Sequence, residues 1–226
     1  MKTRVPVYLY GCGVTARAVH AYFKKDPNFS IEAFVVDEEY YEEKIIDGLP
    51  VLCFQHLNNS AQKTHSFAVC VGYSKLNLDR ELIHKKLVTD GWSITSLVDS
   101  NLKSLSINIG EGTIIMPGAN IQPFCNVGKC AIIWPGAIIG HDTEIEDYCW
   151  LTAGSAIGGN ALIGRSTFVG INATVADNVR VGKYNLLGGH VFVSKCTNNN
   201  EVFLQESTSV ARMQAKHFVK FTKFGE

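Results

Sequence analysis

The hydrophobic pattern of the second half of the chain has a strict period of six residues. Stepping by six from Ile109 to Val193, fifteen successive positions carry only Ile, Val or Leu. These residue types make up about a quarter of the chain, so a run of this length in one frame has a chance probability on the order of one in a billion. A helical period of 3.6 residues cannot produce this pattern, which instead predicts short strands joined by turns.

A second set of positions supports the same frame. Four residues after each aliphatic residue the side chain is small in nearly every repeat, as at Ala119, Cys125 and Ala131, and Gly often follows the aliphatic residue. Six residues then form one flat strand and one turn, and three strands form a triangular coil around an aliphatic interior. We therefore predict a parallel β-helix of about five coils within residues 101–196.

The first hundred residues follow a different pattern, in which apolar runs alternate with amphipathic stretches. The runs at 5–11, 31–37, 49–54, 65–72 and 93–99 are typical of strands, whereas an amphipathic stretch after Gly13 and residues 78–91 are typical of helices. This alternation predicts a small Rossmann-like α/β domain with a parallel sheet over residues 1–100. Residues 197–226 are left as a C-terminal cap or tail that covers the last coil.

Composition narrows the class of protein. The formal net charge is zero and 46% of the residues are hydrophobic, so we expect a globular protein without a nucleic-acid partner. No apolar run reaches the roughly 20 residues that span a bilayer, and the N-terminus lacks a signal peptide pattern, which favours a cytoplasmic location. The seven cysteines contain no CxxC pair and are interpreted as reduced, mostly buried thiols.

A glycine motif lies between the first predicted strand and the following helix. Gly11, Gly13 and Ala16 match G-x-G-x-x-[G/A], and Asp37 ends the next predicted strand. The free amides of a helix N-terminus bind phosphate, so one hypothesis is a nucleotide or diphosphate site. The other is a glycine turn that serves only strand-to-helix packing. About 100 residues before the repeat are too few for a classical dinucleotide dehydrogenase.

Over nearly its whole length the chain resembles the bacterial nucleotide-sugar acetyltransferases of the bacillosamine and perosamine type and the related sialic-acid O-acetyltransferases. The resemblance rests on the glycine turn, the hexapeptide repeat and the segment from Ile139 to Asp147, which reads IGHDTEIED. It implies a left-handed β-helix, a homotrimer, acetyl-CoA as co-substrate and no metal. It also implies that the N-terminal domain binds a UDP- or dTDP-linked amino sugar, whose amine accepts the acetyl group.

The resemblance also assigns catalytic residues. His141 matches the general base of these enzymes, Asp142 matches its acidic neighbour, and the Gly159 amide matches the group that faces the thioester oxygen. The chemistry needs such groups, because an amine that attacks a thioester must lose a proton and a negative oxygen develops in the transition state. Alone, His141 would be interpreted as a surface turn residue.

Further residues are expected to bind the two substrates. The resemblance places Ile171 and Gly189 along the acetyl-CoA groove, although both also suit simple coil turns. Trp134 and Trp150 depart from the Asn and His of relatives, so they either shape the site for a different acceptor or pack the trimer interface. The expected contacts are with acetyl-CoA for Trp150, Ile171 and Gly189, and with the nucleotide sugar for Gly11, Gly13, Val14, Asp37, Gly72 and Trp134.

Three other functions are considered. O-acetylation of a sugar hydroxyl would use the same residues, and the sequence does not decide between the two. A zinc hydratase on a β-helix needs three converging histidines, whereas the repeat region carries only His141 and His190. A non-catalytic binding or scaffold protein is the remaining alternative, which the two departing tryptophans leave open.

Overall fold

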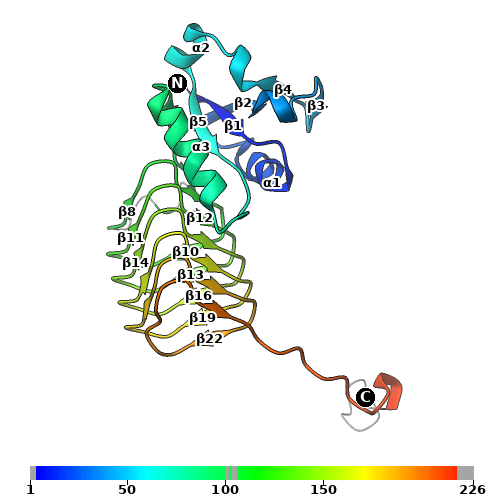
Figure 1. The fold of residues 1–226 in the computed structure, drawn as a ribbon, viewed down its shortest axis with the longest axis vertical. Helices are drawn as coiled ribbons and strands as arrows, with labels where there is room; N and C mark the ends of the chain where they lie inside the picture. The colour runs from blue at the N-terminus through cyan, green and yellow to red at the C-terminus, as the bar shows by residue number, and fades with distance from the viewer. Residues whose placement is uncertain (1–3, 100–101, 103–105, 218–226) are drawn as a thin grey trace.

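The structure, a computed structural model, describes residues 4–99, 102 and 106–217 of the chain. It has two parts, a small α/β domain and a parallel β-helix (Figure 1), so the predicted fold class is confirmed. Residues 218–226 of the predicted C-terminal cap lie outside the described residues.

The α/β domain is built on a six-stranded sheet in the order β3-β4-β2-β1-β5-β6. Its strands are parallel except for the antiparallel pair β3 and β4, of which β3 was not predicted from the sequence. The strands are β1 (Val5–Tyr10), β2 (Phe29–Val36), β3 (Ile45–Ile46), β4 (Leu49–Cys53), β5 (Ser66–Val69) and β6 (Ser93–Ile94). The α-helices are α1 (Val14–Phe23), α2 (Asn59–Thr64) and α3 (Leu78–Thr89), with short 3-10 turns at Glu38–Tyr40 and Phe54–His56.

The predicted strand at 93–99 is two strands, which belong to different parts of the molecule. β6 completes the α/β sheet, whereas β7 (Leu97–Val98) pairs with β9 (Ile114–Ile115) of the β-helix. The polar pair Thr95-Ser96 separates them, and the Ser96 hydroxyl donates to the carbonyl of Gly110. The chain therefore passes directly from one sheet to the other, without a linker at this point.

The β-helix consists of two-residue strands that stack into three flat faces. The first face holds β7, β9 (Ile114–Ile115), β12 (Ile132–Ile133), β15 (Trp150–Leu151), β18 (Phe168–Val169), β21 (Leu186–Leu187) and β23 (Val202–Phe203). The second holds β10 (Asn120–Ile121), β13 (Ile138–Ile139), β16 (Ala156–Ile157), β19 (Thr174–Val175) and β22 (Phe192–Val193). The third holds β8 (Asn108–Ile109), β11 (Asn126–Val127), β14 (Glu144–Ile145), β17 (Leu162–Ile163) and β20 (Arg180–Val181).

Each coil visits the faces in the order first, second, third. We name the turns between them the first corner (for example 134–137), the second corner (140–143) and the third corner (146–149). Ile138 pairs with Ala156, 18 residues further on, so residues 18 apart lie above one another along every face and corner. This stacking decides which side chains meet at a site.

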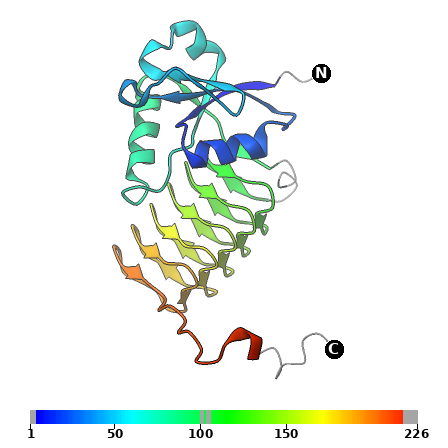
Figure 2. The same ribbon diagram turned by 90° about the vertical axis from the view of Figure 1, so that its right-hand side faces the viewer.

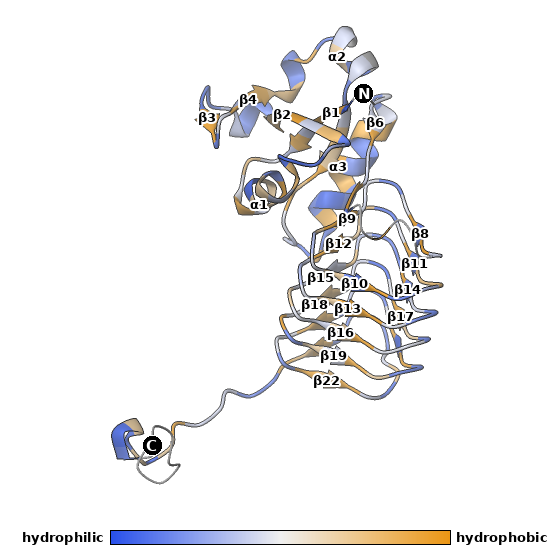
Figure 3. Cartoon of the chain, turned by 180° about the vertical axis from the view of Figure 1, so that it is seen from behind, coloured by the Kyte–Doolittle hydropathy of each residue, from blue (hydrophilic) through white to orange (hydrophobic). Residues whose placement is uncertain are grey.

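The aliphatic positions of the repeat form the interior, as their spacing predicted. Those from Ile115 to Val193 are buried, and the small residues four positions later are buried at the corners. Figure 3 shows the apolar strands stacked along the coil, beside turns that are more polar. Thr143 shows why small polar residues suit these corners, because its hydroxyl donates to the carbonyl of Gly158 in the next coil at 2.8 Å.

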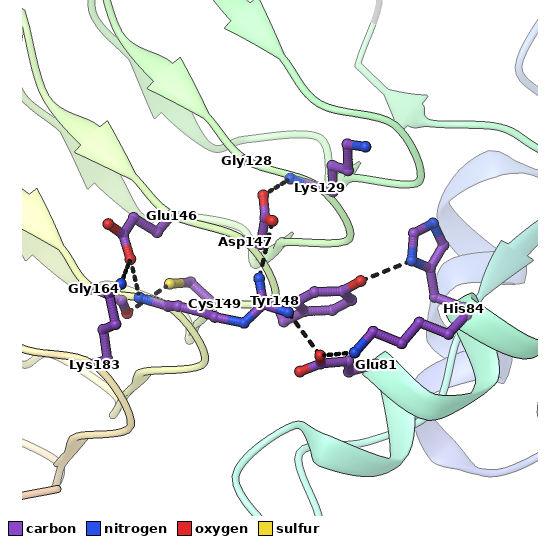
Figure 4. A network of polar contacts seen from close by, with 12 residues as sticks. Glu81, His84, Gly128, Lys129, Glu146, Asp147, Tyr148, Cys149, Gly164 and Lys183 are labelled. Atoms are coloured by element: carbon purple, nitrogen blue, oxygen red, sulfur yellow. Dashed lines mark hydrogen bonds and ion pairs between the residues drawn. The ribbon is translucent and has the colours of Figure 1, made fainter. Parts of the chain in front are cut away.

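Helix α3 joins the two domains by lying against the third corner. The guanidinium of Arg80, 1% exposed, donates to the carbonyls of Cys130 and Tyr148 at 3.0 and 2.6 Å. Glu81 forms an ion pair with Arg165, at 2.7 Å. Figure 4 shows Glu81 and His84 of α3 facing Tyr148 on the β-helix. Polar contacts therefore fix the α/β domain on the coils.

His84 is a buried histidine in this contact. Its Nδ1 and the Tyr148 hydroxyl lie 2.8 Å apart, and its Nε2 has no hydrogen-bond partner among the described residues. Burial lowers the pKa of His84 below its ordinary value and outweighs the opposite effect of the nearby carboxylates Glu111 and Asp147. The neutral imidazole is therefore the form that the folded state prefers.

We expect this histidine to make the protein less stable in acid. As the pH falls through the ordinary histidine pKa of about 6.5, the unfolded chain takes up a proton that folded His84 resists, so the free energy of unfolding falls. Urea unfolding at pH about 7.5 and 5.5 measures the loss, which His84→Gln is expected to reduce. His56→Gln, at an exposed position, is the control. An unchanged pH dependence in His84→Gln would contradict the assignment.

The C-terminal segment first completes the stack and then leaves it. β23 pairs with β21 and closes the end of the first face, whereas residues 204–217 extend away from the coils (Figure 2). In the parts of the chain that the structure describes, no helix has the length and apolar character needed to cross a membrane.

Candidate active site

The second corner carries the predicted catalytic residues. His141 follows β13, with Gly159 one coil further on and Asp177 one coil beyond that. Asp142 occupies the left-handed position of its turn, with φ of 57°, a conformation that Asp and Asn adopt more readily than most residues. The stacking thus brings His141, Asp142 and Gly159 together.

The imidazole of His141 is held at one nitrogen and open at the other. Nδ1 lies 2.8 Å from Oδ2 of Asp142, and because a carboxylate only accepts, Nδ1 donates the proton of this bond. The His141 side chain is 64% exposed, so Nε2 remains accessible to a ligand. The backbone is also fixed, since the amide of His141 donates to Oε1 of Gln122 at 3.0 Å. In the neutral form of the ring, this arrangement leaves Nε2 as the nitrogen that can accept a proton from a ligand.

Gly159 provides the space in which the imidazole lies. A Cβ at Gly159 would stand 2.9 Å from Nε2 of His141, closer than side-chain carbons approach other atoms. The Gly159 amide, expected to face a thioester oxygen, donates instead to Oδ1 of Asp177 at 2.7 Å. The oxyanion role of this amide therefore stays a prediction, which would require the bond to Asp177 to open.

Gln122 and Asp177 are site residues that the sequence analysis missed. Both lie in the second-corner turns adjacent to the His141 and Gly159 turns. Asp177 could have been found from the six-residue frame, because every third repeat returns to the same corner. Steps of 18 residues from His141 lead to Gly159 and then to Asp177.

The residues expected to line an acetyl-CoA groove lie at a different corner. Ile171 and Gly189 are stacked at the first corner, where a Cβ at Gly189 would stand 3.1 Å from Cγ2 of Ile171. Ile171 is 54% exposed and is an accessible apolar surface. The second face separates this corner from His141, so one chain does not bring the two sets together.

The two tryptophans pack between the domains of one chain. Trp150 is 3% exposed, with Tyr73 against its ring at 5.4 Å and the Arg80 guanidinium 5.3 Å from its ring centroid. Trp134 lies 5.9 Å from Trp150, and its buried Nε1 has no hydrogen-bond partner among the described residues. These contacts are packing contacts, and the expected ligand contacts of both residues stay predictions.

A cavity of about 550 Å³ lies at the carboxyl ends of β1, β2 and β5. The strands of the sheet progress in opposite directions from β1, so the cavity is at the switch point where ligands of open α/β sheets bind. Gly11 and Asp37 line it, whereas Gly13, Val14 and Gly72 are not among its lining residues. Gly11 has φ of +106°, which explains the need for glycine after β1.

Asp37 is already hydrogen-bonded inside this cavity. The Tyr10 hydroxyl donates to its Oδ2 at 2.6 Å, and Lys86 and Gln55 both donate to its Oδ1. Burial acts to raise the pKa of Asp37, but the hydrogen bonds from Lys86 and Tyr10 outweigh it and hold the pKa below its ordinary value. The carboxylate is therefore charged at neutral pH and held in place in the lining of the cavity.

The structure is a β-helix of hexapeptide repeats with an N-terminal α/β domain. Residues 106–141 match the family model described as bacterial transferase hexapeptide (six repeats). A search of curated proteins gives no match to this chain.

Among the described residues, no group of three or more His, Cys, Asp or Glu side chains is arranged to hold a metal ion.

Solved structures share the whole two-domain fold. The acetyltransferase domain of PglB from Neisseria gonorrhoeae has a TM-score of 0.77 at 19% identity, covering 88% of this chain and 96% of that chain. PerB from Caulobacter crescentus, in complex with CoA and GDP-perosamine, has a TM-score of 0.74 at 24% identity, covering 87% and 92%. WeeI from Acinetobacter baumannii has a TM-score of 0.71 at 20% identity, covering 87% and 94%. At these identities the likeness establishes the fold.

Proposed function

We propose that the protein is an acetyl-CoA-dependent N-acetyltransferase that acts on the amino group of a nucleotide-linked amino-deoxy sugar. The observation that carries the proposal is the oriented His141–Asp142 pair, with Nε2 open, on a fold shared with PglB and PerB along both domains. A cavity at the switch point of the α/β sheet supplies a place for the nucleotide. The cytoplasm, where acetyl-CoA and nucleotide sugars are made, is the proposed location.

His141 is the proposed general base. The substrate amine attacks the carbonyl carbon of the thioester, the new C–N bond forms, and Nε2 of His141 accepts the proton that the amine loses. The C–S bond then breaks, and the sulfur of CoA leaves and takes up a proton. Asp142 keeps the proton of the ring on Nδ1, so that Nε2 faces the reaction. Two solved structures of the Caulobacter enzyme carry a replaced histidine, with CoA and GDP-perosamine bound.

We propose a homotrimer in which each site is shared by two chains. His141 lies at the second corner, whereas the α/β domain packs on the first face and the third corner of the same chain. Ile171 and Gly189 lie at the first corner. Prisms packed side by side would bring the second corner of one chain to the first corner of the next, and the exposed Ile138 and Phe192 of the second face would become buried. A monomer in solution would contradict this arrangement.

The direct test is release of free thiol from acetyl-CoA. We expect one acceptor from a panel of UDP-, dTDP- and GDP-linked amino sugars to raise the release rate, the GDP sugars being included because PerB binds GDP-perosamine. The matching hydroxy sugars are the controls. Mass spectrometry of the product shows whether the acetyl group is on nitrogen or oxygen, and an acetyl group on oxygen would favour the O-acetyltransferase alternative. No acceptor-dependent release would contradict the proposal.

A further inference from the structure

Between β5 and α3 the chain forms a loop, residues 70–77, that lines the cavity and contacts the β-helix. Val71, Ser74 and Lys75 face the cavity from this loop, opposite Gly11 and Cys12, which follow β1. The loop is therefore placed where it can touch any ligand that occupies the switch point.

The lining of the cavity contains three acidic residues and one lysine. The charged residues of the lining are Asp37, Glu39, Lys75 and Asp79. Asp37 is neutralised by Lys86, which approaches from outside the lining. A diphosphate group carries negative charge and needs donors, and in this lining Lys75 is the side chain that provides a charged one.

Asp79 holds the donors of the loop at the rim of the cavity. The ammonium of Lys75 lies 3.0 Å from Oδ1 of Asp79, and the Ser74 hydroxyl donates to Oδ2 at 2.9 Å. The Lys75 side chain is 71% exposed, so its ion pair is weak and can be exchanged for a ligand oxygen. The pair thus keeps the ammonium beside the cavity without burying it.

The β-helix fixes the backbone of this loop. Three successive residues without glycine, Lys75 to Asn77, have φ of 50°, 50° and 67°, a conformation that persists only where surrounding contacts impose it. Asn77 is fully buried and its amide donates to the carbonyl of Ser166, while Tyr73 lies 4.6 Å from Phe168. Lys75 therefore projects from a loop that is anchored on both sides.

We infer that Lys75 binds the diphosphate of a nucleoside diphosphate-linked ligand in the switch-point cavity, exchanging its ion pair with Asp79 for a phosphate oxygen. The inference rests on the proposed function, which supplies the class of ligand. It also gives Trp150 and Phe168 a role, because they support the loop that carries Lys75.

Calorimetric titration of the full chain with UDP, dTDP and GDP, and with the corresponding nucleosides, tests the inference. We expect Lys75→Met to weaken binding of the preferred nucleoside diphosphate by about tenfold or more and to leave nucleoside binding unchanged. Lys75→Arg is expected to retain the affinity, and Asp79→Asn to retain or strengthen it. Lys44→Met is the matched control, because Lys44 also pairs with a carboxylate, Glu42, but lies outside the lining.

Two results would overturn the inference. One is a folded Lys75→Met protein that binds the nucleoside diphosphate as tightly as the wild type. The other is a wild-type protein that binds none of the three diphosphates. Thiol release is measured separately, so tight, Lys75-dependent binding without acetyl transfer would leave the inference in place and contradict the proposed function.

Discussion

Replacing His141 with alanine is expected to lower kcat for acetyl transfer by about 10²- to 10⁴-fold, the usual contribution of a positioned general base. The imidazole is the group at the second corner whose second nitrogen, Nε2, lies over Gly159 and stays accessible while Nδ1 is held by Asp142. The KM for acetyl-CoA should change little, because binding of the cofactor is assigned to the first corner. Thiol release at saturating concentrations of both substrates measures the effect.

Two further variants separate a catalytic role from a structural one. His56→Ala removes an exposed histidine of the α/β domain and is expected to retain wild-type activity. Gly159→Ala keeps the histidine in the sequence but would put a methyl group 2.9 Å from its Nε2. The imidazole ring must then move away, and kcat should fall. Full turnover by a folded His141→Ala protein would rule out the base.

The repeat made much of the fold predictable from the sequence. A period of six residues is specific to this architecture, because each aliphatic side chain, from Ile115 to Val193, must point into the same narrow interior. The same frame placed His141 in an outward turn. The frame predicts the triangular stack but not the contacts between coils, which is why the bonds that Gln122 and Asp177 accept were missed.

The contact between the domains was not predictable because it is made by polar residues. Arg80 and His84 on α3, and Asn77 directly before it, are buried, although residues of these types are usually interpreted as solvent-exposed. The packing of the two tryptophans between the domains was not predictable either. Trp150 projects outward from the β-helix, and only the position of the α/β domain reveals that Tyr73 and Arg80 cover it.

Replacing Arg80 with methionine is expected to destabilise the protein by about 3 kcal/mol, the largest effect that we predict on folding. In the part of the chain that the structure describes, the hydrogen-bond acceptors of Arg80 are carbonyl and amide oxygens, including those of Cys130, Tyr148 and Asn77. Methionine fills much of the space but donates to none of them, so buried acceptors lose their partner. Burial lowers the pKa of Arg80 to about 10, which leaves the guanidinium charged at neutral pH.

Urea unfolding, followed by circular dichroism, measures this loss. Arg17→Met is the matched control, because Arg17 is exposed and pairs with Asp47 on the surface, and its replacement should leave the free energy of unfolding unchanged. Arg80→Lys is expected to be intermediate, since an ammonium cannot reproduce the planar fork that reaches several turns at once. The nucleoside diphosphate should also bind less tightly to Arg80→Met, because Asn77 and the loop that carries Lys75 lose a support. A stable Arg80→Met protein with wild-type affinity would show that the apolar contacts around Trp150 hold the domains together without the buried cation.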